Sequence, residues 1–245
     1  MFKQRNTSLS HSELGQLSYS AQQFGLSARG LPLELFRPTS KTPEILVMAS
    51  IHGDESLTTV LLSQCLRSIE INALKVAVIL VTNPDGVLAG TRCNARGVDL
   101  NRNFPSTNWS SEPVYYRNRP GDPQNIALSP GFEAGSEPET MALIDLVHTL
   151  KPKLIVSLHG FLACIDDPLN SSIARDMAER TGMALVPDVG YATPGSFGSW
   201  CKEQQIHIIT YELPASSLYE VKKKHIPVLQ DLITGFYNKF LAESS

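Results

Sequence analysis

Four apolar runs, separated from one another by amphipathic or polar sequence, constrain the fold of this chain most strongly. They are EILVMAS at 44–50, KVAVILVT at 75–82, KLIVSLH at 153–159 and IHIITYEL at 206–213. Runs this apolar are typical of strands buried on both faces, and the amphipathic stretches between them favour crossover helices. We therefore expect an α/β fold over residues 1–245 as a single domain, with a mixed, mainly parallel twisted sheet and helices on both faces.

The stretches between the apolar runs predict the remaining elements. A helical pattern runs from Glu55 to Ile69, and two more cover 171–180 and 218–241. Another helix is expected to open at Ser136, where SEPE fits a capping box with Glu139 reaching back to the helix start. Residues 83–135 are rich in Asn, Arg, Pro and Gly, and a loop of that length is usually functional or disordered.

Charge and composition exclude several classes of protein. The net charge of −3 argues against nucleic acid as a partner, because phosphate binding requires a basic face. No apolar run reaches about 18 residues, so we expect no membrane-spanning helix. The first residues lack the apolar core of a signal peptide, and we expect a cytoplasmic protein. The four cysteines form no CxxC pair, which argues against a thiolate zinc site and predicts free thiols.

Polar side chains stand where each predicted strand ends. His52 follows the first run, Asn83 the second, His159 ends the third and Glu212 lies near the end of the fourth. In mainly parallel sheets, binding sites form in loops beyond the carboxyl ends of the strands. We therefore expect these four residues to converge on one site.

Three of the candidate residues form a ligand set for zinc. Catalytic zinc takes three protein ligands, and His52, Glu55 and His159 supply two imidazoles and one carboxylate. Taken alone, His52 and Glu55 would more commonly be a solvated turn, and His159 could be a core histidine. Their joint placement at strand ends favours one zinc ion per chain.

The stretch GVDLNRNFP at 97–105 adds groups that could bind an anion. Arg102 can donate two hydrogen bonds to a carboxylate, Asn101 can add another, and Asp99 could accept a bond from the far nitrogen of His52. A turn held together by Asn and Asp side chains explains the same residues equally well.

The motifs HGDE at 52–55, NPDG at 83–86, GVDLNRNFP and the late YEL resemble the zinc carboxypeptidases of the carboxypeptidase A type (M14). The chain is more similar to a bacterial branch of that family, the murein peptide amidase A enzymes. Three motifs carry that likeness: GSEPET at 135–140, LACIDDP at 162–168 and GYATPGSFGSW at 190–200. The resemblance implies a zinc carboxypeptidase-like fold.

The resemblance also implies roles for individual residues. It makes His52, Glu55 and His159 the zinc ligands, and Glu212 the catalytic glutamate. Asn101 and Arg102 are expected to bind the substrate's carboxylate. Tyr191 is expected to be a mobile tyrosine that contacts the substrate, and Trp200 closes its loop. Arg92 is expected to polarise the scissile carbonyl, although the shortened segment before GVDLNRNFP leaves Arg96 as a competitor for that role.

The implied reaction is zinc-dependent amide hydrolysis of murein tripeptide, L-Ala-γ-D-Glu-meso-diaminopimelate, between γ-D-Glu and diaminopimelate, in cell-wall peptide recycling. Asp166 or Asp167 could bind the side-chain amine of diaminopimelate, unless both belong to a solvated turn before Pro168. Two other classes stay open. One is a zinc deacylase of the aspartoacylase and succinylglutamate desuccinylase type, and the other is a metal-free peptide-binding module.

Overall fold

A computed structural model describes residues 17–39, 42–70, 72–116 and 126–241. Its central sheet has the strand order β4-β3-β7-β8, with β9 also paired to β7. β3 pairs in parallel with β4 and β7, and β7 pairs in parallel with β8. The five strands are β3 (Ile45–Ala49), β4 (Ala77–Ile79), β7 (Leu154–Asp166), β8 (Ala184–Val186) and β9 (His207–Pro214). The mainly parallel sheet predicted from the four apolar runs is confirmed.

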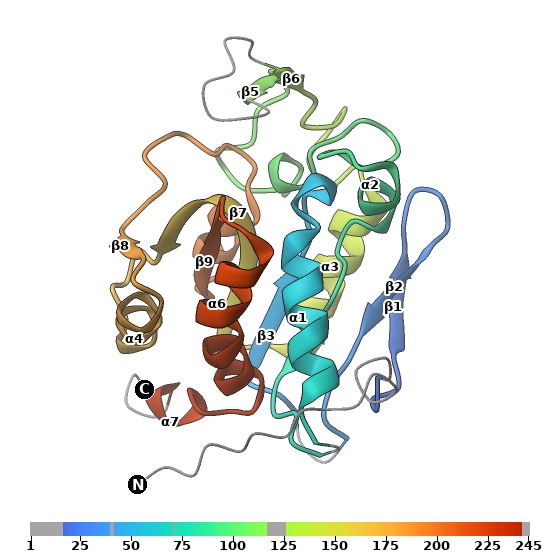
Figure 1. Cartoon of the computed structure of the whole chain (residues 1–245). Helices are drawn as coiled ribbons and strands as arrows, with labels where there is room; N and C mark the ends of the chain where they lie inside the picture. The colour runs from blue at the N-terminus through green and yellow to red at the C-terminus, as the bar shows by residue number, and fades with distance from the viewer. Residues whose placement is uncertain (1–16, 40–41, 71, 117–125, 242–245) are drawn as a thin grey trace, which may run out of the picture.

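Helices cover both faces of this sheet (Figure 1). Alternate residues of β3 enter separate cores: Ile45 and Val47 belong to one, and Leu46 and Met48 to the other. This division follows from the strand period of two, and it requires apolar cover on each side. The first core is completed by α1 (Leu57–Ser68), α4 (Ser172–Thr181) and α6 (Leu218–Ile233), and the second by α3 (Pro138–Leu150) and α5 (Phe197–Glu203).

β7 runs past the end of β9 and returns along it. The partners of β7 rise from His207 to Pro214 as β7 advances from Leu154 to Leu162, and then fall again. Asp166, at the end of β7, faces Thr210 as a result. This turn brings the Asp166 carboxylate, which follows His159 in the same strand, back beside the strand that carries Glu212.

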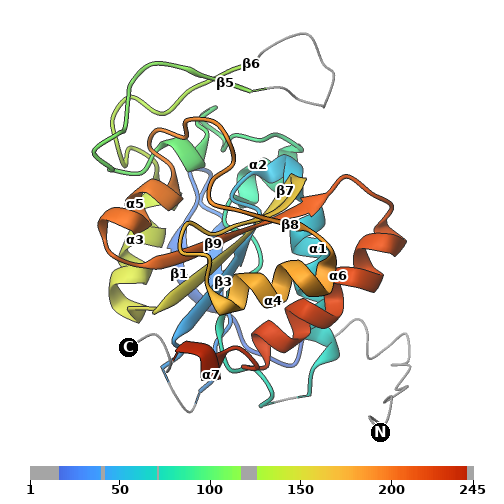
Figure 2. The same cartoon turned by 90° about the vertical axis from the view of Figure 1, so that its left-hand side faces the viewer.

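Shorter elements surround the ends of the sheet. β1 (Gln22–Leu26) and β2 (Pro32–Leu35) form an antiparallel hairpin. A second antiparallel pair, β5 (Val114–Tyr116) and β6 (Ile126–Leu128), stands apart from the central sheet (Figures 1 and 2). The loop predicted at 83–135 also contains α2 (Pro84–Ala89) and a 3₁₀ turn, η2 (Leu100–Arg102).

Two predictions of local structure are wrong. The helix expected to open at Ser136 begins at Pro138, with Glu137 as its N-cap and no side-chain cap, so there is no capping box. The last helix was expected to continue to Leu241, but α6 ends at Ile233 and a separate α7 (Asn238–Leu241) follows. Gly235, at φ +86° between them, adopts a left-handed conformation that a continuous helix does not allow.

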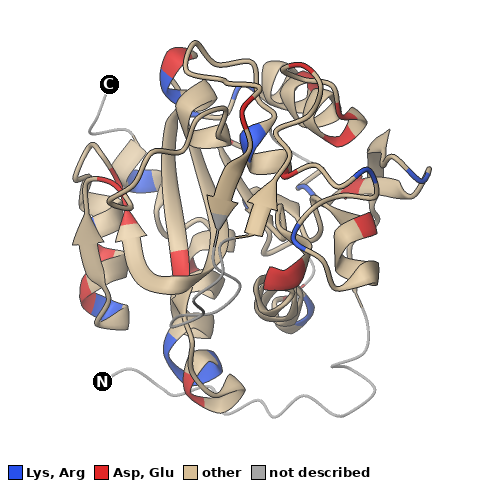
Figure 3. Ribbon diagram, turned by 90° about the horizontal axis from the view of Figure 1, so that it is seen from above, with Lys and Arg blue, Asp and Glu red and all other residues tan. Residues whose placement is uncertain are grey.

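Among the described helices, none is long and apolar enough to cross a membrane. Seen from above, acidic and basic residues are distributed over many elements (Figure 3). The chemistry therefore depends on the charged side chains near the ends of the strands.

Candidate active site

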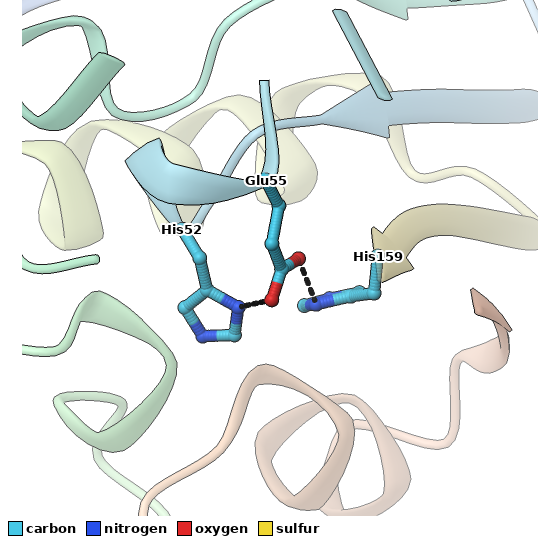
Figure 4. A group of neighbouring side chains, drawn as sticks. All are labelled: His52, Glu55 and His159. Carbon is cyan, nitrogen blue, oxygen red and sulfur yellow. Dashed lines mark hydrogen bonds and ion pairs between the residues drawn. The ribbon is translucent and has the colours of Figure 1, made fainter. Parts of the chain in front are cut away.

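The predicted metal ligands lie together at the ends of β3 and β7. One ligand atom from each of His52, Glu55 and His159 can be chosen so that all lie within 4.8 Å of one another, and all three residues are buried. Glu55 stands between the two imidazoles (Figure 4): its Oε1 lies 2.8 Å from His52 Nδ1, and its Oε2 lies 3.2 Å from His159 Nδ1. His52 is the N-cap of the 3₁₀ turn η1 (Gly53–Glu55), which carries the chain out of β3, and Glu55 is its last residue.

The outer nitrogen of each imidazole also has a partner. His52 Nε2 lies 2.9 Å from Arg92 Nη2 and 3.3 Å from Asp99 Oδ1, and His159 Nε2 lies 3.1 Å from the hydroxyl of Ser157. Such outer partners fix the orientation of a ligating imidazole and raise its basicity. The donor set, two inward-facing Nδ1 atoms and one carboxylate, therefore fits a zinc ion.

Both carboxylates of this cluster are held in the ionised form. Burial alone would raise the pKa of Glu55, but the charge of His52 and the bond to His159 hold it well below its ordinary value. Burial likewise opposes ionisation of Asp99, and Arg92 together with His52 lowers its pKa well below the usual range. The cluster can thus present negative charge to a cation.

Arg92, and not Arg96, lies beside the cluster. The Arg92 guanidinium is 3.0 Å from Asp99 Oδ2 through Nε and 3.3 Å from Glu55 Oε1 through Nη1. Arg92 also lines the cavity described below. The Arg96 side chain is 53% exposed, and its nearest acidic partner is Glu137 Oε2 at 3.6 Å. The geometry therefore favours Arg92 as the group that can reach a carbonyl near the metal.

The predicted carboxylate-binding pair is held by the turn η2. Asp99 accepts a hydrogen bond from the backbone of Asn101 at 2.9 Å, which starts the turn. Asn101 uses its Oδ1 to accept a bond from the Phe197 amide at 2.8 Å, so its NH₂ group is the end that can donate to a ligand. Arg102 is only 5% exposed, and burial lowers its pKa, with a further contribution from Arg92.

Glu212 lies opposite His159, its register partner on the neighbouring strand. It is 6% exposed, and its Oε2 has no hydrogen-bond partner among the described residues. Burial raises the pKa of this carboxyl, and Glu55 raises it further against the opposing effect of His159. A carboxylate with a raised pKa can accept a proton and later return it.

One cavity of about 1450 Å³ is lined by the three metal-ligand candidates and by Arg92, Asn101, Arg102 and Glu212. Tyr191 lies on its wall with 57% of its surface exposed, and Tyr115 of β5 borders the same space. Trp200 is buried and stacks on Phe197 with ring centroids 5.8 Å apart, so it anchors the loop that follows Tyr191. The catalytic and substrate-binding candidates thus share one open cavity.

The two candidate acids after β7 have different surroundings. Asp166 lines the cavity, and its Oδ1 is buried without a hydrogen-bond partner in the described parts of the chain. Burial raises the pKa of Asp166 to about 6, with Asp188 and Asp167 adding to the effect. Asp167 is engaged elsewhere: it accepts bonds from the amides of Leu169 and Ser171 and lies 2.9 Å from His207 Nε2. The structure brings Asp166 to the site and uses Asp167 to hold the turn.

Sequence reasoning missed two residues near the site. Ser157 could have been found as the residue two positions before His159 on the same face of a strand. Asp188, which lines the cavity and interacts with Asp166, gave no signal, because its loop returns to the site only through the pairing of β8 with β7.

Comparison with known proteins identifies a matching family, similar sequences and similar structures. Residues 18–222 match the family described as zinc carboxypeptidase. The chain is 41% identical to murein peptide amidase A of Escherichia coli (strain K12) over 223 residues, which cover 90% of this chain and 92% of that protein. The crystal structure of murein-tripeptide amidase MpaA from Escherichia coli O157 has a TM-score of 0.88 at 39% identity, covering 92% of this chain and 96% of the other. Carboxypeptidase A from Helicoverpa armigera shares the fold, with a TM-score of 0.70 at 18% identity over 96% of this chain and 71% of its own.

Proposed function

Because this chain belongs to the zinc carboxypeptidase family, whose members are metallopeptidases, we propose that it hydrolyses the γ-D-glutamyl–meso-diaminopimelate bond of murein tripeptide. The observation that carries the proposal is the shared cavity. It joins the metal-ligand cluster, the buried cation of Arg102 and the buried acid of Asp166. A C-terminal residue with one carboxylate beside the scissile amide and an amine on its side chain matches these charges.

We assign the metal to His52, Glu55 and His159, which fit zinc by donor type and by proximity. A zinc ion there supplies a Lewis acid that acidifies water and polarises the scissile carbonyl. Asp99 and Ser157 hold the two imidazoles in orientation.

The chain's own side chains carry the remaining steps. Glu212 takes a proton from the attacking water and passes it to the leaving amine, a role that suits its raised pKa. Arg92 stabilises the negative charge that develops on the carbonyl oxygen, a contribution worth about 3–4 kcal/mol for one well-placed donor.

Three groups hold the substrate. Arg102 and the NH₂ of Asn101 bind the free carboxylate next to the scissile amide, which fixes the cut to the last residue. Asp166 binds the side-chain amine of that residue, with Asp188 close enough to contribute charge. Tyr191 covers the bound peptide from the loop side of the cavity.

The test is a digest of purified murein tripeptide followed by mass spectrometry. The expected products are L-Ala-γ-D-Glu and free diaminopimelate, with the metal-free, chelated protein as the inactive control. An intact tripeptide together with rapid cleavage of simple N-acyl amino acids would overturn the proposal in favour of a deacylase.

A further inference from the structure

The first turn of α3 contains two buried acids that do not line the cavity. Glu137 and Glu139, from the GSEPET stretch, are each 1% exposed. Neither caps the helix with its side chain. Burying two carboxylates is costly unless they are hydrogen-bonded, so their partners indicate what they are for.

Both acids converge on one amide, that of Asn94. Asn94 Nδ2 donates to Glu137 Oε2 at 2.7 Å and to Glu139 Oε2 at 3.2 Å. The other oxygen of Glu137 accepts a bond from the hydroxyl of Ser136 at 2.9 Å, and that of Glu139 accepts one from the Ala28 amide at 2.9 Å. The shorter of the two bonds to Asn94 belongs to Glu137.

Asn94 in turn closes the segment between Arg92 and Asp99. Its Oδ1 accepts bonds from the backbone amides of Arg96 at 3.0 Å and Val98 at 3.1 Å. The backbone amide of Asn94 donates to the Val98 carbonyl at 2.9 Å. Arg92 and Asp99 then meet through their side chains at 3.0 Å. Every side-chain hydrogen-bonding position described for Asn94 therefore serves to hold this loop in one shape.

The same turn of α3 reaches the carboxylate-binding segment by a separate route. The backbone amide of Glu137 donates to Asn103 Oδ1 at 3.1 Å, and Asn103 Nδ2 donates to the Ser136 hydroxyl at 3.0 Å. Asn103 directly follows Arg102. The side chain of Glu137 is thus connected to Arg92 through Asn94, whereas its backbone amide is connected to Arg102 through Asn103.

We propose that Glu137 is a positioning residue, whose carboxylate holds Arg92 at the scissile carbonyl through Asn94. This inference rests on the proposed function, in which Arg92 acts on the transition state and Arg102 binds the ground state. The inference therefore predicts different kinetic effects for the two connections. Loss of the Glu137 carboxylate lowers kcat, and loss of the Asn103 side chain raises KM.

The experiment compares Glu137→Ala, Glu137→Gln and Asn103→Ala on any peptide the enzyme cleaves. Glu137→Ala should lower kcat by about 10- to 100-fold with little change in KM, the size expected when a catalytic group moves by about an ångström. Glu137→Gln keeps an acceptor for Asn94 and should recover most of that loss. Asn103→Ala should mainly raise KM, and all three proteins should retain about one zinc per chain.

A double-mutant cycle with Arg92→Ala separates positioning from general loss of structure. If Glu137 acts through Arg92, Glu137→Ala should add little to the defect of Arg92→Ala. Tyr237→Phe is the matched control, because it removes another hydrogen bond of a buried side chain, 2.6 Å to Asp176, without touching this loop, and it should keep kcat.

Multiplicative kcat losses in the double variant would overturn the inference while leaving the proposed function intact. Unchanged kcat in Arg92→Ala would overturn the role of Arg92 and the inference with it. If Glu137→Ala does not fold, Asn94→Ala replaces it in the same cycle, because it removes the residue that connects Glu137 to the loop carrying Arg92.

Discussion

Two groups of side chains in the cavity differ in how their buried polar atoms are satisfied. In the metal group, His52, Glu55 and His159, both ring nitrogens of each histidine and both oxygens of the acid have a protein partner. In the substrate group, Glu212 Oε2, Asp166 Oδ1 and Arg102 Nε are buried without a partner among the described residues. All three of these atoms belong to residues that line the cavity, where a ligand can supply the missing partner.

The pKa values follow the same division. In the metal group the pKa of Glu55 is held down, because His52 and His159 outweigh the effect of burial. In the substrate group burial raises the pKa of both Glu212 and Asp166. Unsatisfied buried groups cost free energy, and such costs are tolerated where the function requires them. The comparison therefore predicts that substitutions in the metal group reduce zinc content and stability, whereas substitutions in the substrate group reduce turnover or specificity and leave zinc and stability nearly unchanged.

The largest effect is expected in the metal group. His52→Ala and His159→Ala should lose both zinc and activity, because each removes one of the three protein ligands that a catalytic zinc site requires. Elemental analysis should give about one zinc per chain for the wild type and almost none for either variant. Wild-type zinc content in both variants would show that the ion binds elsewhere.

Glu212→Gln should leave zinc in place and remove turnover. We expect kcat to fall by at least ~100-fold, the lower end of what general acid–base help contributes. Stopped assays on murein tripeptide with the zinc-loaded variant measure the loss. Activity close to the parent's would remove Glu212 from the mechanism and weaken the distinction between the two groups.

The stability of the metal-free protein should distinguish Glu55 of the metal group from Glu212 of the substrate group. Glu55→Gln removes the negative charge and one of the two acceptor oxygens that serve His52, His159 and the Gly160 amide, and should lower the free energy of unfolding by about 3 kcal/mol. Glu212→Gln removes an acid whose Oε2 has no described partner, and should cost less than about 1 kcal/mol. Urea unfolding of chelated proteins gives both values, and equal losses would contradict the comparison.

The smallest effect concerns pH. The pKa of Asp166 is raised to about 6, so its carboxylate is ionised above that pH and protonated below it. KM for a peptide ending in diaminopimelate should therefore fall as the pH rises through about 6, because only the ionised acid binds the ammonium. The step should disappear in Asp166→Asn, and its persistence there would assign it to another group.

Much of the sheet and the metal cluster could be predicted from sequence. Buried parallel strands are continuous apolar runs, and the residues that follow them meet at one edge of the sheet for reasons of topology alone. That logic found His52, Glu55, His159 and Glu212. It was wrong for Asn83, which does not line the cavity and instead caps α2 by accepting a hydrogen bond from the Gly86 amide. The assignments of their roles stay predictions until they are tested, as do the expected location in the cytoplasm and the single-domain organisation.

The rest depended on tertiary contacts that have no local signal. The return of β7 along β9 places Asp166 in the cavity and leaves Asp167 in a turn, although the two residues are adjacent. The SEPE stretch fits a capping box by pattern, but Asn94 and Ala28 provide better partners for its acids than the helix end does. Competing partners from distant segments are invisible in the sequence of the segment itself.

One competition assay tests most directly the claim that the unsatisfied group is built for a zwitterionic residue. Two γ-D-Glu dipeptides, ending in diaminopimelate and in leucine, are mixed at equal concentration and digested, and the released amino acids are measured by mass spectrometry. The account predicts that the wild type releases diaminopimelate in large excess, because leucine leaves Asp166 unpaired, and that Asp166→Asn loses most of that preference. Equal release of the two residues by the wild type would contradict it.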